Sequence, residues 1–408
     1  MRKSIVNTLL LGLVVASLPS VGRAAGYYVT DLGADVQPNG INASGEIAGS
    51  SNDQAIWYDG TPHYLTGSGG EGLGINDKGQ VVGIDLSLGK AFFYDGTTTQ
   101  TLWNGGAFAI NNNGQILGTG NTANRYIPGD GPFIYNVSDG SQQDISSILP
   151  SSGYGFALND TGQVAGYATN NGDWQAYLYD GASLNFLPIF PGEPPAIGIN
   201  NSGWVVSSKR QSDFDNAVLW DGTSVHGLGN LGGHLTQAYD VNNPGQVVGT
   251  SDTIGYGNEH AFLYQGNAMI DLNSVLTENS GWLLTQGTAI NDKGQIAGLG
   301  TLNGQSHGVL LTPVIPGDVN ADGIVNGEDL ALMSSTWLQT GSGFAPIPQA
   351  DANGDGVVNA QDLALASSNW LATPSSGNSA AVPEPSTLIL APLCGIALLA
   401  CRRSIGRF

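Results

Sequence analysis

The sequence predicts a mainly β protein, in which a seven-bladed β-propeller-like repeat domain precedes a small α-helical domain and a C-terminal hydrophobic helix. Three observations predict this fold class. A ten-residue motif recurs seven times between residues 40 and 298. An acidic twelve-residue loop occurs twice between residues 318 and 362, each time before a short helical pattern. An apolar stretch runs from residue 388 to residue 400.

The composition agrees with a β-rich repeat and excludes several classes of protein. Glycine accounts for 61 of the 408 residues and charged residues for 11%, which argues against long amphipathic helical bundles. The net charge of −21 argues against nucleic acid as a partner, because phosphate binding needs clustered lysine and arginine. The two cysteines, Cys394 and Cys401, are too few for a disulfide framework or a cysteine-rich metal site.

Residues 1–24 have the three parts of a secretory signal peptide. A basic start at Arg2 and Lys3 leads into an apolar run, and small residues precede a cut after Ala24. A transmembrane anchor is the alternative, which the short apolar run disfavours. We therefore expect the rest of the chain to be exported.

The seven copies of the motif predict the strands of the repeat domain. The N-x-x-G turn lies between two short apolar runs, as in a β-hairpin. An apolar strand of the AFLY type and a weaker leucine-containing strand follow, which makes four short strands and the size of one propeller blade. The first asparagines of the copies are Asn42, Asn76, Asn111, Asn159, Asn200, Asn242 and Asn291.

Residues 25–313 are expected to close into a ring. The last repeat ends at Pro313 without a fourth strand, and a lone strand stands at Tyr27 to Gly33. This strand is expected to complete the final blade, because closure removes an exposed sheet edge. An open β-solenoid is the alternative, since solenoids also stack repeats of this kind.

The repeats contain no pattern that identifies a catalytic residue. The five histidines are scattered, and no two of them have the spacing of metal ligands on one helix. Aspartates that recur before glycine are expected to form turns; they are Asp59, Asp95, Asp180 and Asp221. The tryptophans are expected to fill the spaces between blades, with a sugar-binding surface as the alternative.

Residues 318–329 and 351–362 share the pattern D-x-N-x-D-G-x-V-N-x-x-D, which is that of an EF-hand calcium loop. Oxygen ligands at positions one, three, five, seven, nine and twelve suit Ca²⁺, and we expect two ions in all. An acidic turn without metal is the alternative. The expected ligands are Asp318, Asn320, Asp322, Ile324 through its carbonyl, Asn326, Asp329, Asp351, Asn353, Asp355, Val357 through its carbonyl, Asn359 and Asp362.

A helical pattern follows each loop, and Pro313 and Pro316 forbid a full helix before the first one. A loop and an exiting helix, repeated once, closely resemble a type I dockerin domain over residues 314–371. The resemblance implies calcium-dependent folding and binding to a cohesin module of another protein. It also implies that loop positions ten and eleven help to select the partner; these are Gly327, Glu328, Ala360 and Gln361.

Two further resemblances concern export. The repeats resemble HAF-type extracellular repeats, named for the motif at His260-Ala261-Phe262. The last 27 residues resemble a PEP-CTERM sorting signal. Its Val-Pro-Glu-Pro motif stands at residues 382–385, at the end of a linker over 372–386, and the apolar span and basic end form the tail at 387–408. This implies processing by an exosortase-type membrane protease and delivery to the cell surface. A retained stop-transfer segment is the alternative.

Together these features predict an exported cell-surface interaction protein, with the dockerin attached to a cohesin-bearing partner and the propeller presenting a ligand. An enzyme is the less favoured class. The alternative is a glycoside hydrolase that degrades polysaccharide, which needs two carboxylates about 5–10 Å apart in a cleft.

Overall fold

The computed structural model describes residues 26–120, 131–150, 153–189, 197–211, 214–254, 257–276, 281–319, 325–335, 350, 352 and 358–370. The predicted signal peptide, linker and C-terminal hydrophobic helix lie outside these residues. Within the described ranges, no helix is long and apolar enough to cross a membrane.

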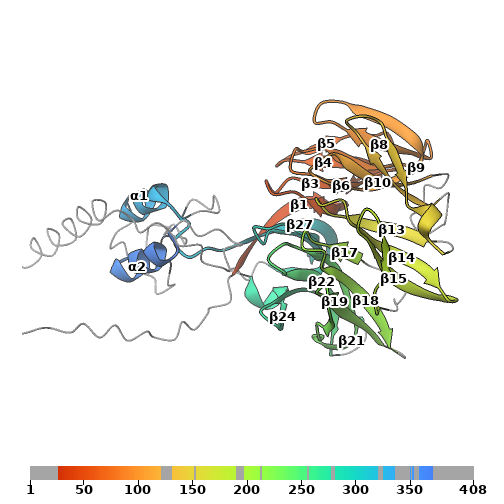
Figure 1. Cartoon of the computed structure of the whole chain (residues 1–408). Helices are drawn as coiled ribbons and strands as arrows, with labels where there is room; N and C mark the ends of the chain where they lie inside the picture. The colour runs from red at the N-terminus through yellow and green to blue at the C-terminus, as the bar shows by residue number, and fades with distance from the viewer. Residues whose placement is uncertain are drawn as a thin grey trace, which may run out of the picture.

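The prediction of seven separate blades is wrong. The strands form a β-propeller of five blades, where each blade is one hydrogen-bonded sheet: three sheets have four strands, one has seven and one has eight. The sheets follow one another around the ring in chain order, so that the last lies beside the first (Figure 1).

The three four-stranded sheets have simple antiparallel order. The first is β2 (Val36–Ile41), β3 (Ile47–Ser51), β4 (Gln54–Tyr58) and β5 (Pro62–Tyr64). The second is β13 (Gly153–Leu158), β14 (Val164–Asn170), β15 (Asp173–Tyr179) and β16 (Leu184–Phe186). The third joins the two ends of the domain, in the order β1 (Tyr27–Ala34), β27 (Gln305–Pro313), β26 (Ile296–Leu302) and β25 (Trp282–Ile290).

Two sequence repeats share one sheet in each of the larger blades. The seven-stranded sheet contains β6 (Gly70–Ile75), β7 (Val81–Asp85), β8 (Lys90–Tyr94), β9 (Thr99–Ile110), β10 (Gln115–Gly120), β11 (Pro132–Asn136) and β12 (Gln142–Asp144). Strand β9 is twelve residues long and pairs with both β8 and β10. The hydrogen bonds between strands therefore continue from one repeat into the next.

The eight-stranded sheet is joined in another way. It contains β17 (Ile197–Ile199), β18 (Val205–Gln211), β19 (Phe214–Trp220), β20 (Val225–Gly227), β21 (Gly232–Val241), β22 (Val247–Thr253), β23 (Glu259–Gln265) and β24 (Ala268–Asp271). A parallel pairing of Asp215 in β19 with Leu235 in β21 links the two repeats. The short 3-10 helices are η1 (Ser146–Ile148) and η2 (Leu272–Val275).

The prediction that the first strand closes the ring is confirmed. Strand β1 pairs antiparallel with β27, with Tyr27 opposite Pro313 and Thr30 opposite Leu310. The His307 Nδ1 atom lies 2.9 Å from Asp31 Oδ1 and adds a side-chain contact to the same pair of strands. This closure covers the edge that β27 would otherwise expose.

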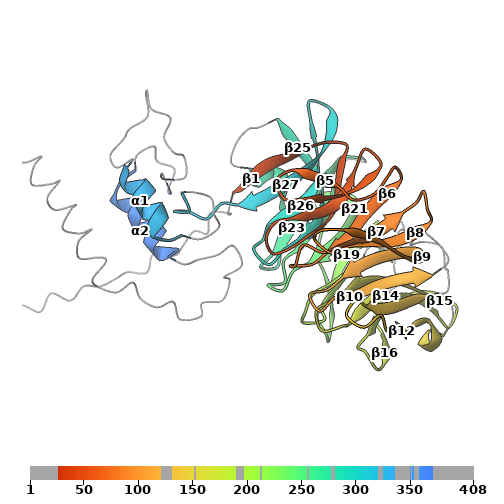
Figure 2. The same cartoon turned by 90° about the horizontal axis from the view of Figure 1, so that it is seen from above.

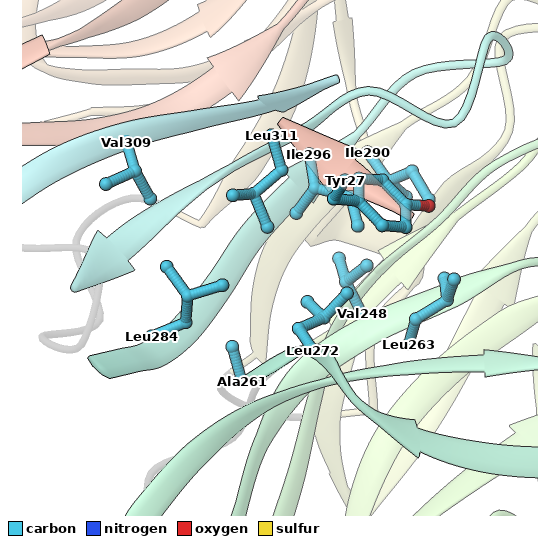
Figure 3. Packing of buried hydrophobic residues seen from close by; sticks show 10 residues of the cluster. All are labelled: Tyr27, Val248, Ala261, Leu263, Leu272, Leu284, Ile290, Ile296, Val309 and Leu311. Atoms are coloured by element: carbon cyan, nitrogen blue, oxygen red, sulfur yellow. The ribbon is translucent and has the colours of Figure 1, made fainter. Parts of the chain in front are cut away.

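Tyr27 anchors the closing strand in the core. Its side chain packs among buried residues from two neighbouring sheets, including Val248, Leu263 and Ile296 (Figure 3). Its hydroxyl donates to the carbonyl of Gly294 at 3.4 Å. The cluster therefore ties the N-terminal strand to both the last sheet and the eight-stranded sheet beside it.

Replacing Tyr27 by Ala is expected to lower the free energy of unfolding of the propeller by about 3 kcal/mol, because a buried aromatic side chain leaves a cavity. The matched control is Thr30→Ala, at an exposed position of the same strand, with an expected change within about 0.5 kcal/mol. Chemical denaturation followed by tryptophan fluorescence measures both variants. Equal, small effects would show that the strand contributes nothing to closure.

The turn aspartates behave as predicted. In the turn after β8, Asp95 Oδ1 accepts hydrogen bonds from the main-chain N–H of Thr97 at 2.8 Å and of Thr98 at 2.7 Å. These bonds, with those from the two threonine hydroxyls, lower the pKa of the Asp95 carboxyl. Equivalent bonds occur at Asp59, Asp180 and Asp221, so a structural role accounts for this repeated residue.

Most of the tryptophans contribute to the core. Those that pack, partly buried, against buried clusters are Trp57, Trp103, Trp204, Trp220 and Trp282. Trp174 differs, with 39% of its surface exposed. The prediction that the tryptophans fill space in the core therefore holds for these five side chains.

Two α-helices follow the propeller, α1 (Gly327–Ser335) and α2 (Ala360–Ser368). They lie next to each other and apart from the ring in both views (Figures 1 and 2). Met333 of α1 and Ala366 of α2 are buried in one small cluster, as the helical pattern predicted. The cluster also contains Ile315, Val319, Val325, Ala350 and Val358.

Candidate functional site

The predicted calcium loops are described in part. The structure places five of the twelve predicted ligands, which are Asp318, Asn326, Asp329, Asn359 and Asp362. The others lie outside the described residues; they are Asn320, Asp322, Ile324, Asp351, Asn353, Asp355 and Val357.

The last aspartate of each loop is fully buried at the start of the following helix. Both Asp329 and Asp362 have 0% of their surface exposed. Asp329 Oδ1 accepts from the main-chain N–H of Val319 at 2.7 Å, and its Oδ2 accepts from that of Asn326 at 2.8 Å. The carboxylate of Asp329 thus connects the beginning of its loop to the end.

The second loop repeats this arrangement 33 residues later. Asp362 Oδ2 accepts from the main-chain N–H of Asn359 at 2.8 Å, as Asp329 does from Asn326. Asn359 Oδ1 in turn accepts from the N–H of Gln361 at 2.8 Å and caps α2. The ends of the two loops therefore share the same internal hydrogen bonds.

Burial makes these carboxylates a fitting part of a cation site. A buried carboxylate costs several kcal/mol unless a positive charge lies near it. The sequence has no lysine or arginine between Lys293 and Arg402 that could supply this charge from within the segment. The donors are carboxylate and amide oxygens, which suit Ca²⁺. Within the described ranges no group of three or more His, Cys, Asp or Glu is gathered for a metal.

The predicted partner-binding positions lie on the surface. Gly327 and Glu328 form the exposed first turn of α1, and Ala360 and Gln361 form the exposed first turn of α2. Each pair stands directly beside a buried aspartate. Each exposed pair and the buried aspartate of the predicted ion site therefore belong to the same first turn of a helix.

The repeated asparagines form a closed ring at the centre of the propeller. Each is buried, and its Nδ2 donates to the main-chain carbonyl of the asparagine in the next repeat at 2.9–3.1 Å. The last bond runs from Asn291 back to Asn42 at 2.9 Å. Each turn also has the glycine that the motif predicts, with φ between 71° and 85°. Sequence reasoning predicted the turn but missed the bonds between repeats.

A second circle of bonds lies one residue further along each motif. The main-chain N–H at this position donates to the side-chain Oδ1 of the equivalent residue in the next repeat at 2.8–2.9 Å. The accepting residues are Asp77, Asn112, Asp160, Asn201, Asn243 and Asp292. Ala43 takes this position in the first repeat and has no side-chain acceptor.

The two circles border a cavity of about 600 Å³. Its wall combines main chain and aliphatic side chains of the motif with the aromatic rings of Phe108, Phe156 and Tyr239. Among the described residues that line it, only Asp160, Asp240 and Asp292 carry charge. The cavity is therefore electronegative.

Asp240 is half-buried in the cavity wall, and main-chain N–H groups hold both of its carboxylate oxygens. Its Oδ1 accepts from the N–H of Val241 at 2.8 Å, and its Oδ2 accepts from the N–H of Ile290 at 2.9 Å. Burial raises the pKa of Asp240 to about 6, in spite of these two hydrogen bonds, and the charge of Asp292 adds to the rise. Sequence reasoning missed this residue.

The comparisons with known proteins concern the two domains separately. Residues 316–369 match the Dockerin type I domain. This segment is a type I dockerin domain. Dockerins typically bind calcium, bind cohesin-bearing partners and occur in extracellular or cell-surface proteins. No curated protein matches the chain.

Several solved structures are similar to this chain at very low sequence identity. The β-propeller domain of the Trilobed protease from Pyrococcus furiosus is 9% identical, with 69% of this chain and 94% of that chain covered and a TM-score of 0.47. YCF48, solved with a D1 peptide, is 10% identical, with 71% and 95% covered and a TM-score of 0.47. Pyrococcus horikoshii acylaminoacyl peptidase is 10% identical, with 68% of this chain and 51% of that chain covered and a TM-score of 0.42. No functional conclusion follows from these likenesses.

Proposed function

We propose that the chain is an exported cell-surface interaction protein. Its dockerin docks to a cohesin-bearing partner in a calcium-dependent way, and its propeller presents a ligand-binding surface. The observation that carries this proposal is the pair of fully buried aspartates, Asp329 and Asp362, at the starts of the two dockerin helices.

Two calcium ions, one in each loop, would neutralise these buried carboxylates. The six predicted ligands of the first loop run from Asp318 to Asp329, and those of the second from Asp351 to Asp362. When bound, calcium supplies positive charge that the segment lacks. The loop residues supply the oxygen atoms and bring the first turns of the two helices into a fixed position.

The exposed first turns of α1 and α2 are the surface that meets the cohesin. Glu328 and Gln361 are the larger side chains of this surface. Because each is position eleven of its calcium loop, their positions depend on whether the loop is folded. Export would use residues 1–24, and residues 387–408 would be the target of a sorting protease.

The geometry of the propeller favours a binding role over glycoside hydrolysis. The rim carboxylates serve as acceptors between repeats: Asp160 accepts from Asn112, and Asp292 accepts from Asn243. Asp240 accepts two main-chain hydrogen bonds. These contacts give each carboxylate a structural role within the ring. A structural role for all three makes polysaccharide cleavage the less favoured of the two functions.

Cohesin modules encoded by the same genome provide the test, with the full chain immobilised and binding followed by biolayer interferometry. We expect at least one module to bind in calcium and to dissociate when a chelator is added. The double variant Asp329→Ala and Asp362→Ala should lose binding, because both buried charges and both loops are disrupted.

Asp173→Ala is the control, because it removes an exposed carboxylate of the propeller. It should bind cohesin as the parent chain does. Substitution of Glu328 and Gln361 by Ala should weaken binding without removing calcium uptake. Failure of every cohesin module to bind in calcium would refute the attachment role.

A further inference from the structure

The central cavity contains one charged residue that breaks the pattern of the repeats. Two residues before the ring asparagine, six repeats have Gly or Ala, namely Gly40, Gly74, Ala109, Ala157, Gly198 and Ala289. The remaining repeat has Asp240. All seven positions line the cavity. A ring of small residues is therefore interrupted by a single carboxylate.

The neighbouring repeat leaves space for this carboxylate. A side-chain carbon at Gly198 would lie 3.2 Å from Asp240 Oδ1 and 2.9 Å from its Cα. The main-chain N–H groups of Val241 and Ile290 fix the two oxygens from the side of the wall. Asp240 is thus held in one position at the cavity surface.

The surroundings of Asp240 select for positive charge. The other charged residues of the lining are Asp160 and Asp292, and both are acidic. Phe108, Phe156 and Tyr239 contribute aromatic rings to the same wall. Carboxylates that face a partly enclosed acidic cavity are a typical environment for an ammonium or guanidinium group, because they form charge-assisted hydrogen bonds with it.

We propose that the central cavity binds a small organic cation through an ammonium or guanidinium group that pairs with the carboxylate of Asp240. The volume of about 600 Å³ is in the range of small-molecule pockets and is much larger than a single ion needs. The polar residues of the lining include Gln286, Asn39, which donates to the carbonyl of Gly72, and Gln237, which accepts from the Tyr239 hydroxyl.

This inference deepens the ligand-presenting role proposed above and rests on it. The cation has two possible sources, a free amine or the lysine or arginine side chain of a partner protein. The chemistry at Asp240 is the same for both. The two sources differ in what surrounds the charge, so the probes must include both kinds.

Isothermal titration calorimetry on the full chain at pH 7.5 tests the proposal. Butylamine and agmatine represent free cations, and a capped tripeptide with a central lysine represents a protein side chain. Butanol and butyrate are the neutral and anionic controls, and calcium chloride at matched ionic strength tests for a metal. We expect the cations to bind and the controls not to bind. Tighter binding of the tripeptide than of butylamine would assign the cation to a protein.

Two variants distinguish the contribution of Asp240 to cation binding from that of the overall negative charge of the cavity. Asp240→Ala introduces alanine, which three other repeats have at this position, so we expect the variant to fold. The midpoint of its unfolding transition checks this. It should weaken cation binding by about tenfold or more, as truncation of a buried charge pair does. Asp292→Asn removes a rim charge but keeps an acceptor for Asn243, and should weaken binding by less than about threefold.

The pH dependence of the parent chain gives a second, independent readout. Since burial raises the pKa of Asp240 to about 6, the carboxylate is neutral at pH 4.5 and binding should be lost there. Asp292 and Asp160 face the same cavity, so the series is repeated on Asp292→Asn. This variant should also lose binding as the pH falls, at a slightly lower pH, because the charge of Asp292 contributes to the raised pKa of Asp240.

Four results would each overturn the proposal. Asp240→Ala could bind the cations as tightly as the parent chain does, or butanol could bind as tightly as butylamine. Cation binding could persist at pH 4.5, or calcium without a cation could give heat of binding at the cavity in the Asp329→Ala and Asp362→Ala double variant. Cohesin docking is measured separately. Loss of the amine interaction with intact docking would remove the cavity ligand alone, and the reverse result would refute the attachment role alone.

Discussion

Removal of calcium from the full chain will unfold residues 316–369 and leave the propeller folded. The dockerin has a small core, and two fully buried carboxylates lie next to it. Without a cation each carboxylate costs several kcal/mol, more than a core of this size can offset. The propeller has its own buried clusters and closes through β1 and β27, so its stability does not depend on the loops.

Hydrogen exchange followed by mass spectrometry measures this effect segment by segment. With calcium, peptides from α1 and α2 should exchange slowly; after chelation they should exchange at the rate of an unfolded chain. Peptides from β22 and β26 should be unchanged in both conditions. Magnesium at the same concentration is the control and should restore little protection, because it prefers a tighter octahedral site. Helices that stay protected in chelator would contradict the prediction.

Replacement of Asn159 by Ala will strongly destabilise the propeller. Its Nδ2 donates to the carbonyl of Asn200 at 2.9 Å and to Gln163 Oε1 at 2.7 Å. Its Oδ1 accepts from the N–H groups of Thr161 and Gln163. The variant leaves several buried groups without a partner, and each costs about 1–3 kcal/mol. We expect a total loss of about 3–5 kcal/mol.

Asn185→Ala is the matched control, because Asn185 is exposed on the short strand β16 of the same sheet. Its expected effect is within about 0.5 kcal/mol. Urea denaturation followed by tryptophan fluorescence compares the two variants. A loss below about 1 kcal/mol for Asn159→Ala would mean that the ring of asparagines contributes little to the closure of the propeller.

The local structure of the repeats could be predicted from the sequence because it depends on neighbouring residues. The turn asparagine, the glycine three residues after it and the strands on either side are all set within ten residues. The closing role of the strand at Tyr27 also followed, since the last repeat has no fourth strand of its own. The dockerin segment was recognisable because its acidic loop pattern has a fixed spacing and occurs twice.

The blade count could not be predicted in the same way. Whether β9 ends one sheet or continues into the next depends on which carbonyls meet which N–H groups across the strands, and the repeat pattern does not contain this information. The parallel link between β19 and β21 is likewise a contact between residues 20 positions apart, Asp215 and Leu235.

The candidate sites were missed to different degrees. The bonds between asparagines of adjacent repeats require the repeats to be placed around a ring, so no single repeat reveals them. Asp240 did have a signal in the sequence, because an aspartate stands where six other repeats have Gly or Ala. Comparison of the repeats position by position would have found it.

Titration of calcium into the metal-free full chain, followed by isothermal titration calorimetry, tests the central claim most directly. The proposed function predicts saturable uptake of two ions, reduced to one when Asp329 alone is replaced by Ala and abolished when Asp362 is replaced as well. The absence of uptake at millimolar calcium, or a stoichiometry that neither substitution changes, would contradict it.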